Sequence, residues 1–317
     1  MKMLRGMFGL FSLAATWRAA QCNPRLNSSL EVHGAHQQSF SQPAGGVLVK
    51  TTFSSTFRLV FLVGLEGSGH HYLTPAVNHI RPTGDDDHDY CNELKLMYKR
   101  LGIKQSMTKS PSHYRERIED ARGYMQTLAQ YASSLRSKEA GAMLCDKNSY
   151  PRLSGAEKVF SYIDLGTLAN LAEDEGIDLR VIYLKRSAKQ MIISTTVHRK
   201  FYENLTEQDS TSKGYMEYMR ILFTVITVMQ SFLAGLDSKF VVCHDFDYLG
   251  DLGQASKIAR HVAPRKELER ELVDSLLRDT PKPSLGKEEP FEFEHAEFVV
   301  TRLQRQLDTF EFLYCRH

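Results

Sequence analysis

The sequence lacks the features that mark several common classes of protein. It has 5 cysteines in 317 residues and no CxxC pair among them, which argues against a zinc ribbon, a thioredoxin-type redox site and a dense disulfide scaffold. Lysine and arginine number 40 against 38 aspartate and glutamate, a formal net charge of +2. This charge is too small for affinity that depends on neutralising a nucleic-acid backbone. We therefore expect no nucleic-acid partner, and any bound anion must be held by a local site.

What is present is the composition of an ordinary globular protein. Hydrophobic residues make up 42% and charged residues 25% of the chain, with 20 glycines and 10 prolines, which argues against a disordered, collagen-like or coiled-coil protein. The stretch 221–236 contains no charged residue, but it is shorter than the roughly 18 to 20 residues that a membrane span needs. We expect a buried helix there, ending at Gly235.

The N-terminal segment has the pattern of a targeting signal. The first thirty residues contain no acidic side chain, and they carry four cations and an apolar stretch at 7–17. Residues 27–46 are rich in Ser, Gln, His and Gly, the composition of a linker. We therefore expect a targeting segment and linker at 1–46 and one folded domain at 47–317.

The favoured destination is the secretory pathway, with the Golgi lumen or secretion as its end points. Two N-glycosylation sequons, at Asn27 and Asn204, agree with a lumenal glycoprotein. Import into an organelle is the alternative. Contact with a membrane is expected only through the N-terminal segment, if that segment is not cleaved.

Hydrophobic patterning predicts an α/β fold. Short apolar runs rich in β-branched residues predict buried strands at 57–63, 142–145, 179–184 and 240–243. Apolar residues that recur every three or four positions predict helices at 114–135, at 159–171 behind a capping box of Ser154 and Glu157, at 268–276 and at 300–313. Strands that alternate with helices predict a doubly wound parallel sheet of about four or five strands, with helices on both faces.

A glycine-rich loop follows the first predicted strand. The segment 64–71 reads Gly-Leu-Glu-Gly-Ser-Gly-His-His and precedes a predicted helix. Glycines allow a tight turn whose N–H groups point inward, and a helix N-terminus adds positive potential, so a phosphate or sulfate group is the natural ligand. A tight β–α connection without a ligand is the alternative. The candidate residues of this anion site are Gly64, Gly67, Ser68 and Gly69.

The loop differs from that of ATP- and GTP-hydrolysing proteins. Its glycine spacing matches GxxxxGK[ST], but His70 replaces the lysine and His71 replaces the Ser or Thr that binds magnesium. A P-loop kinase or NTPase is therefore a less favoured alternative. Adjacent histidines point in different directions on a helix and no third ligand lies at a standard spacing, so we expect no metal site.

A second candidate anion site follows the third predicted strand. Strand 179–184 is followed by Lys185 and Arg186, at the carboxyl edge of a central strand, where parallel sheets bind ligands. The guanidinium of Arg186 can hold a phosphate through two hydrogen bonds. Ser194 lies about two turns into the next predicted helix and can supply a hydroxyl from the same side.

These motifs resemble those of sulfotransferases that use 3′-phosphoadenosine 5′-phosphosulfate (PAPS). In that family a strand ending in Arg, with a Ser eight residues later, binds the 3′-phosphate, and Arg186 and Ser194 are similar to that pair. The family's loop of the form [KR]-x-G-[TS]-[TS] binds the 5′-phosphosulfate, and segment 67–71 is similar to it. Segments 145–151 and 244–249 are similar to the EKSPxY and YEDL elements of Golgi-type members. The resemblance spans about residues 58–262 and implies a P-loop, sulfotransferase-like fold with PAPS as co-substrate.

One departure from the family concerns the cation of the loop. Gly67 stands where the family has Lys or Arg, and His70 and His71 stand where it has hydroxyl residues. The cation stabilises the leaving phosphate, so its loss either disables transfer or moves the role to another group. The available substitutes are His70, His71, Lys147 and Lys185. Lys147 is also the candidate for contact with the transferring sulfuryl group.

The general base has several candidates. Golgi-type members of the family carry a carboxylate some twenty residues after the loop, and Asp87 and Asp89 lie at that distance. Other members use a histidine, since an imidazole pKa near ~6.5 suits proton removal at neutral pH. His70, His71 and His113 are the candidates of that kind.

The resemblance thus implies an enzyme that moves a sulfuryl group from PAPS to a hydroxyl or amine acceptor, without a metal. The acceptor is expected to be a glycan or another small molecule. Two alternatives remain: a sulfotransferase-like protein that binds a nucleotide or glycan without turnover, and the kinase or NTPase named above. Intact Arg186 and Ser194 favour recognition of adenosine 3′,5′-bisphosphate whether or not transfer takes place.

Overall fold

A computed structural model of the chain describes residues 57–65, 68–82, 102–105, 116–135, 141–144, 152–154, 159–194, 212–248, 250–278 and 297–315. All of these residues lie within the compact unit Thr51–His317. The expected targeting segment and linker at 1–46 fall outside the described residues.

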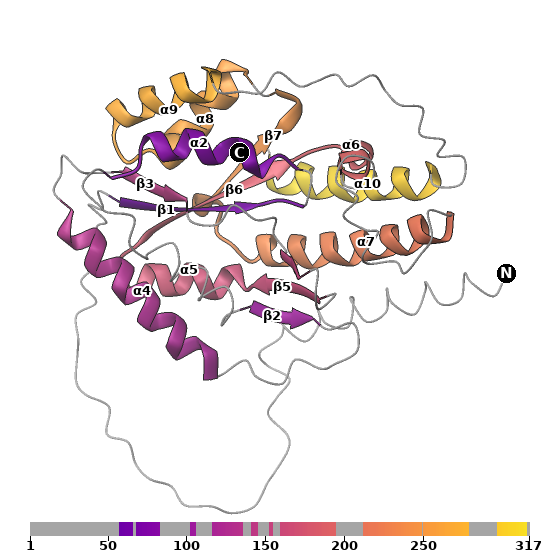
Figure 1. The fold of residues 1–317 in the computed structure, drawn as a ribbon, viewed down its shortest axis with the longest axis horizontal. Coiled ribbons are helices and arrows are strands. Elements are labelled where there is room, and N and C mark those ends of the chain that lie inside the picture. The colour runs from indigo at the N-terminus through magenta and orange to yellow at the C-terminus, as the bar shows by residue number, and fades with distance from the viewer. Residues whose placement is uncertain are drawn as a thin grey trace, which may run out of the picture. The chain divides into compact units, whose positions relative to one another are not determined.

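A four-stranded parallel sheet forms the centre of the fold and confirms the predicted α/β class. Its order is β3 (Gly141–Leu144), β1 (Phe57–Val63), β6 (Asp178–Lys185) and β7 (Val241–Asp245), with every neighbouring pair parallel. The four predicted strands agree with these within one or two residues. Because neighbours in the sheet are distant in the chain, each connection crosses over the sheet through helices (Figure 1).

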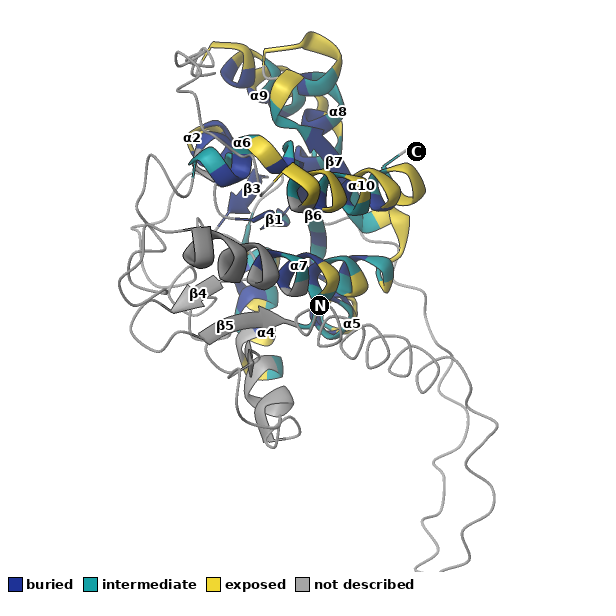
Figure 2. Cartoon of the chain, turned by 90° about the vertical axis from the view of Figure 1, so that its right-hand side faces the viewer, coloured by how far each residue is buried: buried dark blue, intermediate teal, exposed yellow. Residues whose placement is uncertain are grey.

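Both faces of the sheet are apolar, which is why helices cover both. In β1, Phe57, Leu59, Phe61 and Val63 belong to one core cluster, whereas Val60 and Leu62 belong to the other. Side chains alternate along a strand, so a continuous apolar run has two faces to bury. Figure 2 shows the buried residues concentrated on the strands and on the helix faces turned toward them.

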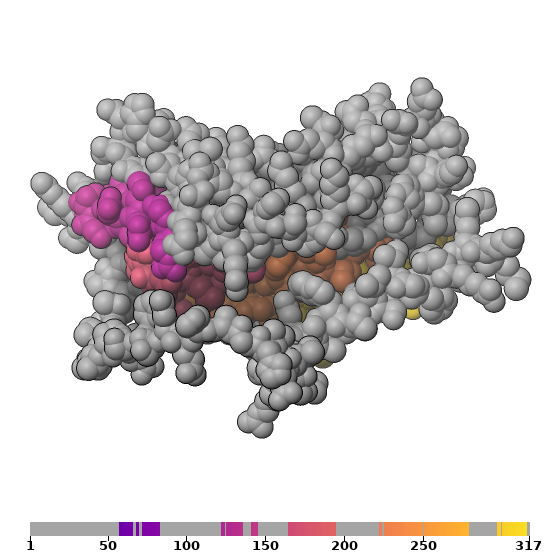
Figure 3. Space-filling view, turned by 90° about the horizontal axis from the view of Figure 1, so that it is seen from below, coloured from indigo at the N-terminus to yellow at the C-terminus, as the bar shows by residue number. Residues whose placement is uncertain are grey.

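The helices divide between the two faces according to these clusters. One face is covered by α2 (His70–His79), α8 (Leu252–Val262) and α9 (Lys266–Arg278). The other is covered by α4 (Glu116–Ser134), α5 (Leu165–Asp174), α6 (Ala188–Ile193), α7 (Ser212–Ala234) and α10 (Glu297–Tyr314). The magenta of α4 and the orange of α7 appear on the same side of the molecule in Figure 3.

The predicted helix at 159–171 is wrong in its first half. Val159–Ile163 forms strand β5, which pairs antiparallel with β2 (Gly102–Gln105) and β4 (Arg152–Ser154) in a separate three-stranded sheet. Val159 and Ile163 are four residues apart, a spacing that shares one face in a helix and also in a strand, so it does not discriminate between them. The aromatic and β-branched composition of this segment favours the strand.

The actual cap of α5 is Asp164 and not the predicted capping box. Its Oδ1 accepts hydrogen bonds from the N–H groups of Gly166 at 3.0 Å and Thr167 at 3.3 Å. These bonds satisfy two of the N–H groups that the first turn of a helix leaves unpaired. The predicted cap residue Ser154 instead belongs to β4.

The uncharged stretch 221–236 lies in α7 and the turn after it, as predicted. Its buried residues recur every three or four positions: Leu222, Val225, Ile226, Met229 and Leu233. The helix ends at Ala234, immediately before Gly235. Within the described ranges, no helix combines the length and apolar character that crossing a membrane requires.

Arg58 is the one charged residue inside β1, and it joins the first strand to α8. Its Nε donates to Asp178 at 2.8 Å, and its Nη1 donates to the carbonyl oxygens of His261 at 3.1 Å and Ala263 at 2.6 Å. The carbonyl groups at the end of a helix have no partner within the helix, and this guanidinium supplies one. Arg58 therefore fixes the end of α8 against the sheet.

We expect Arg58→Met to lower the free energy of unfolding by about 2 to 4 kcal/mol, because helix carbonyls and a part-buried carboxylate lose a charged donor. Urea denaturation of the full chain measures this. The control is Arg122→Met. Arg122 forms surface ion pairs with Asp174 at 3.2 Å and Glu175 at 3.7 Å, and the Arg122 and Asp174 side chains are 36% and 55% exposed, so the loss of Arg122 should cost less than about 1 kcal/mol. Equal costs for the two variants would contradict the role given to Arg58.

Candidate anion-binding site

Three of the four parallel strands bring their carboxyl ends together at one edge of the sheet. Val63 at the end of β1 pairs with Tyr183 of β6, and Lys185 at the end of β6 pairs with Asp245 of β7. The residues that follow these strands are therefore neighbours in space. They are the glycine-rich loop after β1, Arg186 after β6 and Phe246 after β7.

The loop forms a tight turn that leads into α2. The N–H of Ser68 donates to the carbonyl oxygen of Leu65 at 2.9 Å, and Gly69 is the N-cap of α2 with φ 99°. A Cβ at Gly64 would come within 2.3 Å of Ser68 Oγ and 3.0 Å of Leu184 Cβ, so a larger residue at this position would displace neighbouring side chains. The N-terminus of α2 faces this turn, as in sites that bind anions.

Ser68 is a buried polar residue of the loop. Its side chain is fully buried, and its Oγ has no hydrogen-bond partner among the residues that the structure describes. Leaving a buried hydroxyl unpaired costs about 1 to 3 kcal/mol. A phosphate or sulfate oxygen in the turn could accept its hydrogen bond, which is consistent with the anionic group expected from the sequence.

Phe246 connects the loop to Arg186. Its ring lies so close to Gly69 that a Cβ there would come within 2.3 Å of Cδ2. The guanidinium carbon of Arg186 lies 4.3 Å from the centroid of the same ring, a cation–π contact. The two candidate anion sites, which are distant along the chain, are thus joined through one aromatic side chain.

The position of Arg186 is also set by the helix that follows it. Its Nε donates to Oε1 of Gln190 at 3.2 Å, and Ser187 caps α6 by accepting the N–H of Gln190 at 3.2 Å. Ser194 lies at the other end of this short helix, where it is the C-cap and its N–H donates to the carbonyls of Gln190 and Met191. Ser194 is thus about two turns from Arg186, as the sequence predicted.

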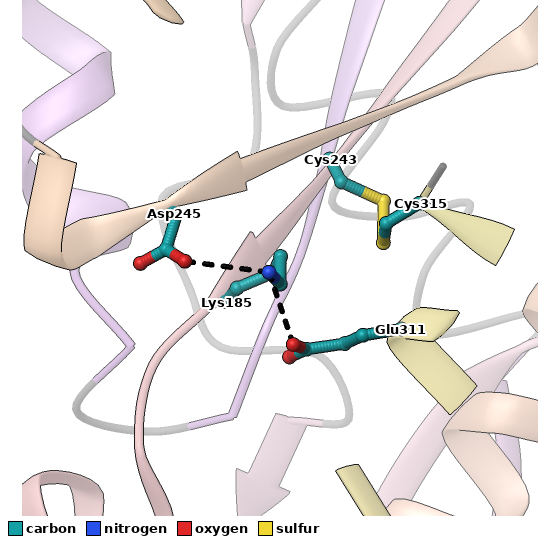
Figure 4. The surroundings of a disulfide bond; sticks show 5 residues. All are labelled: Lys185, Cys243, Asp245, Glu311 and Cys315. Carbon is teal, nitrogen blue, oxygen red and sulfur yellow. Dashed lines mark hydrogen bonds and ion pairs between the residues drawn. A yellow bond between two sulfur atoms is a disulfide. The ribbon is translucent and has the colours of Figure 1, made fainter. Parts of the chain in front are cut away.

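Lys185 is held by two carboxylates. Its Nζ lies 3.3 Å from Asp245 Oδ2 and 3.0 Å from Glu311 Oε2 on α10 (Figure 4). Although burial opposes it, the hydrogen bonds and charges of Glu311 and Asp245 raise the pKa of Lys185. Its ammonium is already neutralised, which disfavours Lys185 as the substitute for the missing loop cation.

His244 is a buried polar residue of β7 on the face that carries α2. It is 2% exposed, its ring stacks on Tyr72 at 5.9 Å between centroids, and neither ring nitrogen has a hydrogen-bond partner within the described part of the chain. Burial lowers the pKa of His244 to about 4, although Asp245 and Gln254 oppose this shift. The ring is therefore neutral at physiological pH.

The remaining predicted site residues are only partly visible. The backbones of His70 and His71 begin α2, but their side chains fall outside the described residues, as do Gly67, Asp87, Asp89, His113 and Lys147. Sequence reasoning missed Phe246, although it lies in the segment 244–249 that was compared with the YEDL element. It also missed Glu311, because that residue is 126 positions from Lys185 and carries no motif.

No metal site stands out in the described residues, where no three His, Cys, Asp or Glu side chains form a group able to hold an ion.

Comparison of the chain with family models, with curated proteins and with solved structures found no match in any of the three. The fold and the site alone therefore define the class: an α/β protein with a glycine-rich loop and an arginine at the carboxyl edge of its parallel sheet.

We expect Gly69→Ala to destabilise the protein by about 1 to 3 kcal/mol, because an L-residue is strained at this positive φ and its Cβ would collide with Phe246. The matched control is Gly123→Ala. Gly123 lies exposed in α4 with no atom within 4 Å of an added Cβ, so this variant should gain about 0.5 to 1 kcal/mol. Thermal and urea unfolding measure the change in the free energy of unfolding for both variants. A Gly69→Ala variant as stable as the unmodified protein would contradict the contact with Phe246.

The low pKa of His244 predicts a loss of stability in acid. The unfolded chain binds a proton at this residue near pH 6.5 but the folded chain only near pH 4, so stability is complete above pH 6.5 and falls as the pH drops toward 4. Between pH 7.5 and pH 5 the loss is about 2 kcal/mol for this histidine.

Urea denaturation at the two pH values checks this. His244→Gln should reduce the pH dependence by that amount, whatever its effect on stability at pH 7.5. His79→Gln is the control, because His79 is exposed at the end of α2. An unchanged pH dependence in His244→Gln would show that the imidazole is not buried as neutral.

Proposed function

We propose that this protein is a PAPS-dependent sulfotransferase that acts on a hydroxyl or amine acceptor. The observation that carries the proposal is the contact of one ring, Phe246, with both Gly69 of the loop and Arg186 after β6. This arrangement offers two anion-binding elements at a fixed spacing on one sheet edge. A nucleotide with phosphates on both its 3′ and 5′ positions is a ligand of that kind, and PAPS supplies the sulfuryl group that is transferred.

The residues of this chain have separate tasks in the proposal. The loop at 64–71 and the N-terminus of α2 bind the 5′-phosphosulfate, with Ser68 Oγ as a donor. Arg186 and Ser194 bind the 3′-phosphate. His70, His71, Asp87 and Asp89 are the proposed bases that take the acceptor's proton, and Lys147 is the proposed contact to the sulfuryl group. As the acceptor oxygen or nitrogen bonds to sulfur, the bond from sulfur to the phosphate oxygen breaks and adenosine 3′,5′-bisphosphate leaves.

A second candidate is a protein that binds the nucleotide or a glycan without turnover. Gly67 in place of the loop cation favours it, because no positive side chain at that position stabilises the leaving phosphate. A protein that binds the nucleotide without turnover is expected to have the same nucleotide affinity as the enzyme, whereas a protein that binds only a glycan is expected to have none. The nucleotide-binding form and the enzyme differ in whether sulfuryl transfer follows, with glycans as the first acceptors to assay.

We also propose that the protein resides in the lumen of the secretory pathway, in the Golgi or beyond. A disulfide joins Cys243 to Cys315, and such bonds persist in oxidising compartments and are rare in the cytosol. The cation-rich N-terminal segment agrees with this destination.

Calorimetric titration of the full chain with adenosine 3′,5′-bisphosphate, and separately with ATP and magnesium, tests the nucleotide site. We expect micromolar affinity for the bisphosphate and none for ATP. Arg186→Ala should weaken binding at least about 30-fold, because it removes a charged bidentate donor. Phe246→Leu should weaken bisphosphate binding about 5- to 10-fold, because the Arg186 guanidinium loses its cation–π contact with the aromatic ring.

The control for this series is Lys189→Ala, which removes an exposed lysine of the same helix, three residues after Arg186. Its affinity should equal that of the unmodified protein. If Lys189→Ala and Arg186→Ala weaken binding equally, the anion is held by general positive charge and not by the proposed site. Binding of ATP alone would favour the alternative that the protein is a P-loop kinase or NTPase. Binding of neither nucleotide would overturn the proposal.

A further inference from the structure

The disulfide joins the two segments that carry Asp245 and Glu311, the carboxylate partners of Lys185. Cys243 precedes Asp245 by two residues on β7, and Cys315 follows Glu311 by four residues and comes directly after the end of α10. Both partners of Lys185 therefore belong to the segments that the disulfide joins (Figure 4). The N–H of Cys315 donates to the carbonyl oxygen of Glu311 at 2.9 Å. This hydrogen bond closes the last turn of the helix, which carries Glu311, and the disulfide joins that turn to β7.

The disulfide is a main anchor of that last turn. The body of α10 is held by buried Leu303, Leu307 and Phe310. Beyond Phe310 the side chains of Phe312, Leu313 and Tyr314 are 54%, 58% and 38% exposed. The last turn therefore buries little apolar surface of its own. The stacking of Tyr314 on Phe310, at 4.5 Å between centroids, and the ion pair of Glu311 with Lys185 hold it in place, together with the covalent link to β7.

Glu311 also sets the charge at the edge of the sheet. Ionised Lys185, Asp245 and Glu311 together carry a net charge of −1, because one cation faces two carboxylates, and the 3.0 Å contact from Nζ to Glu311 favours the ionised pair. Arg186 follows Lys185 directly in the chain. A negative cluster beside an anion site weakens anion binding, and moving Glu311 away would leave a neutral Lys185–Asp245 pair.

We propose that the Cys243–Cys315 disulfide is a redox switch that controls anion affinity at this sheet edge through Glu311. The inference rests on the proposed function, since the anion is the bisphosphate nucleotide. A dithiol reductant attacks one sulfur, the S–S bond breaks, and two protein thiols form as the reductant is oxidised to its own disulfide. The last turn of α10 then separates from β7, Glu311 leaves Lys185, and anion affinity rises.

The first experiment titrates adenosine 3′,5′-bisphosphate into the full chain before and after reduction with dithiothreitol. We expect the reduced protein to bind about 5- to 20-fold more tightly. Binding equilibria are reciprocal, so saturating bisphosphate should shift the reduction equilibrium of Cys243–Cys315 toward the thiols by the same factor. Mass spectrometry of alkylated peptides in dithiothreitol buffers measures that shift. Equal affinities in the two redox states would overturn the proposal.

Two variants separate this bond from other effects of reduction. The double variant C243S/C315S should bind as tightly as the reduced protein without any reductant, which excludes effects at Cys22, Cys91 or Cys145. Glu311→Gln keeps the disulfide and should gain the same affinity while oxidised. Asp308→Asn is the control, because it removes an exposed carboxylate one turn earlier on α10 and should leave affinity unchanged. Circular dichroism verifies that each variant is folded.

A final readout does not depend on the nucleotide. Acetylation of Lys185, followed by peptide mass spectrometry, should be faster in the reduced protein and in oxidised Glu311→Gln, because the amine has lost a carboxylate partner. If Lys185 responds in this way but no bisphosphate binds, the redox-dependent release of Lys185 by Glu311 stands and the proposed function fails. If bisphosphate binds and Lys185 reactivity is the same in both redox states, the proposed function stands and the switch is overturned.

Discussion

The pairing of β6 with β1 on one side and β7 on the other is the constraint on which the site depends. Parallel pairing aligns the carboxyl ends of the three strands at one edge, so the segments that follow them meet although they are distant in the chain. Because both faces of the sheet are apolar, helices cover both, and only the edges remain open to a ligand. The candidate anion site therefore lies where the loop, Arg186 and the segment after β7 meet.

At this edge, packing and charge are closely linked. Phe246 packs on a glycine of the loop and carries the guanidinium of Arg186 on its ring, so an apolar contact sets the spacing between two polar elements. One residue earlier, Asp245 shares Lys185 with Glu311 of α10. The two neighbouring cations thus differ in kind: Arg186 is supported by an aromatic ring, whereas Lys185 is neutralised by carboxylates.

At the opposite edge of the sheet, where β1 and β6 begin, charged residues have a structural role. Arg58, Asp178 and Arg180 form a part-buried network there, and Arg58 also satisfies carbonyl groups at the end of α8. His261 lies against this network, and burial together with the positive charge of Arg180 and Arg58 lowers its pKa to about 4. The same strands therefore begin at a stabilising charged cluster and end at a candidate binding site.

The sequence by itself determined the α/β class, the four parallel strands, the long helix α7 and the glycine-rich loop, because periodicity and local turn chemistry are local properties of the chain. It did not determine β5, since residues four apart share a face in a strand as well as in a helix, nor α8, which its apolar pattern did not reveal. Only the tertiary structure decided that Phe246 joins Gly69 to Arg186, that Glu311 reaches Lys185, and that Cys243 pairs with Cys315. These contacts join residues distant in the chain, and no spacing along a single sequence encodes which distant side chains meet.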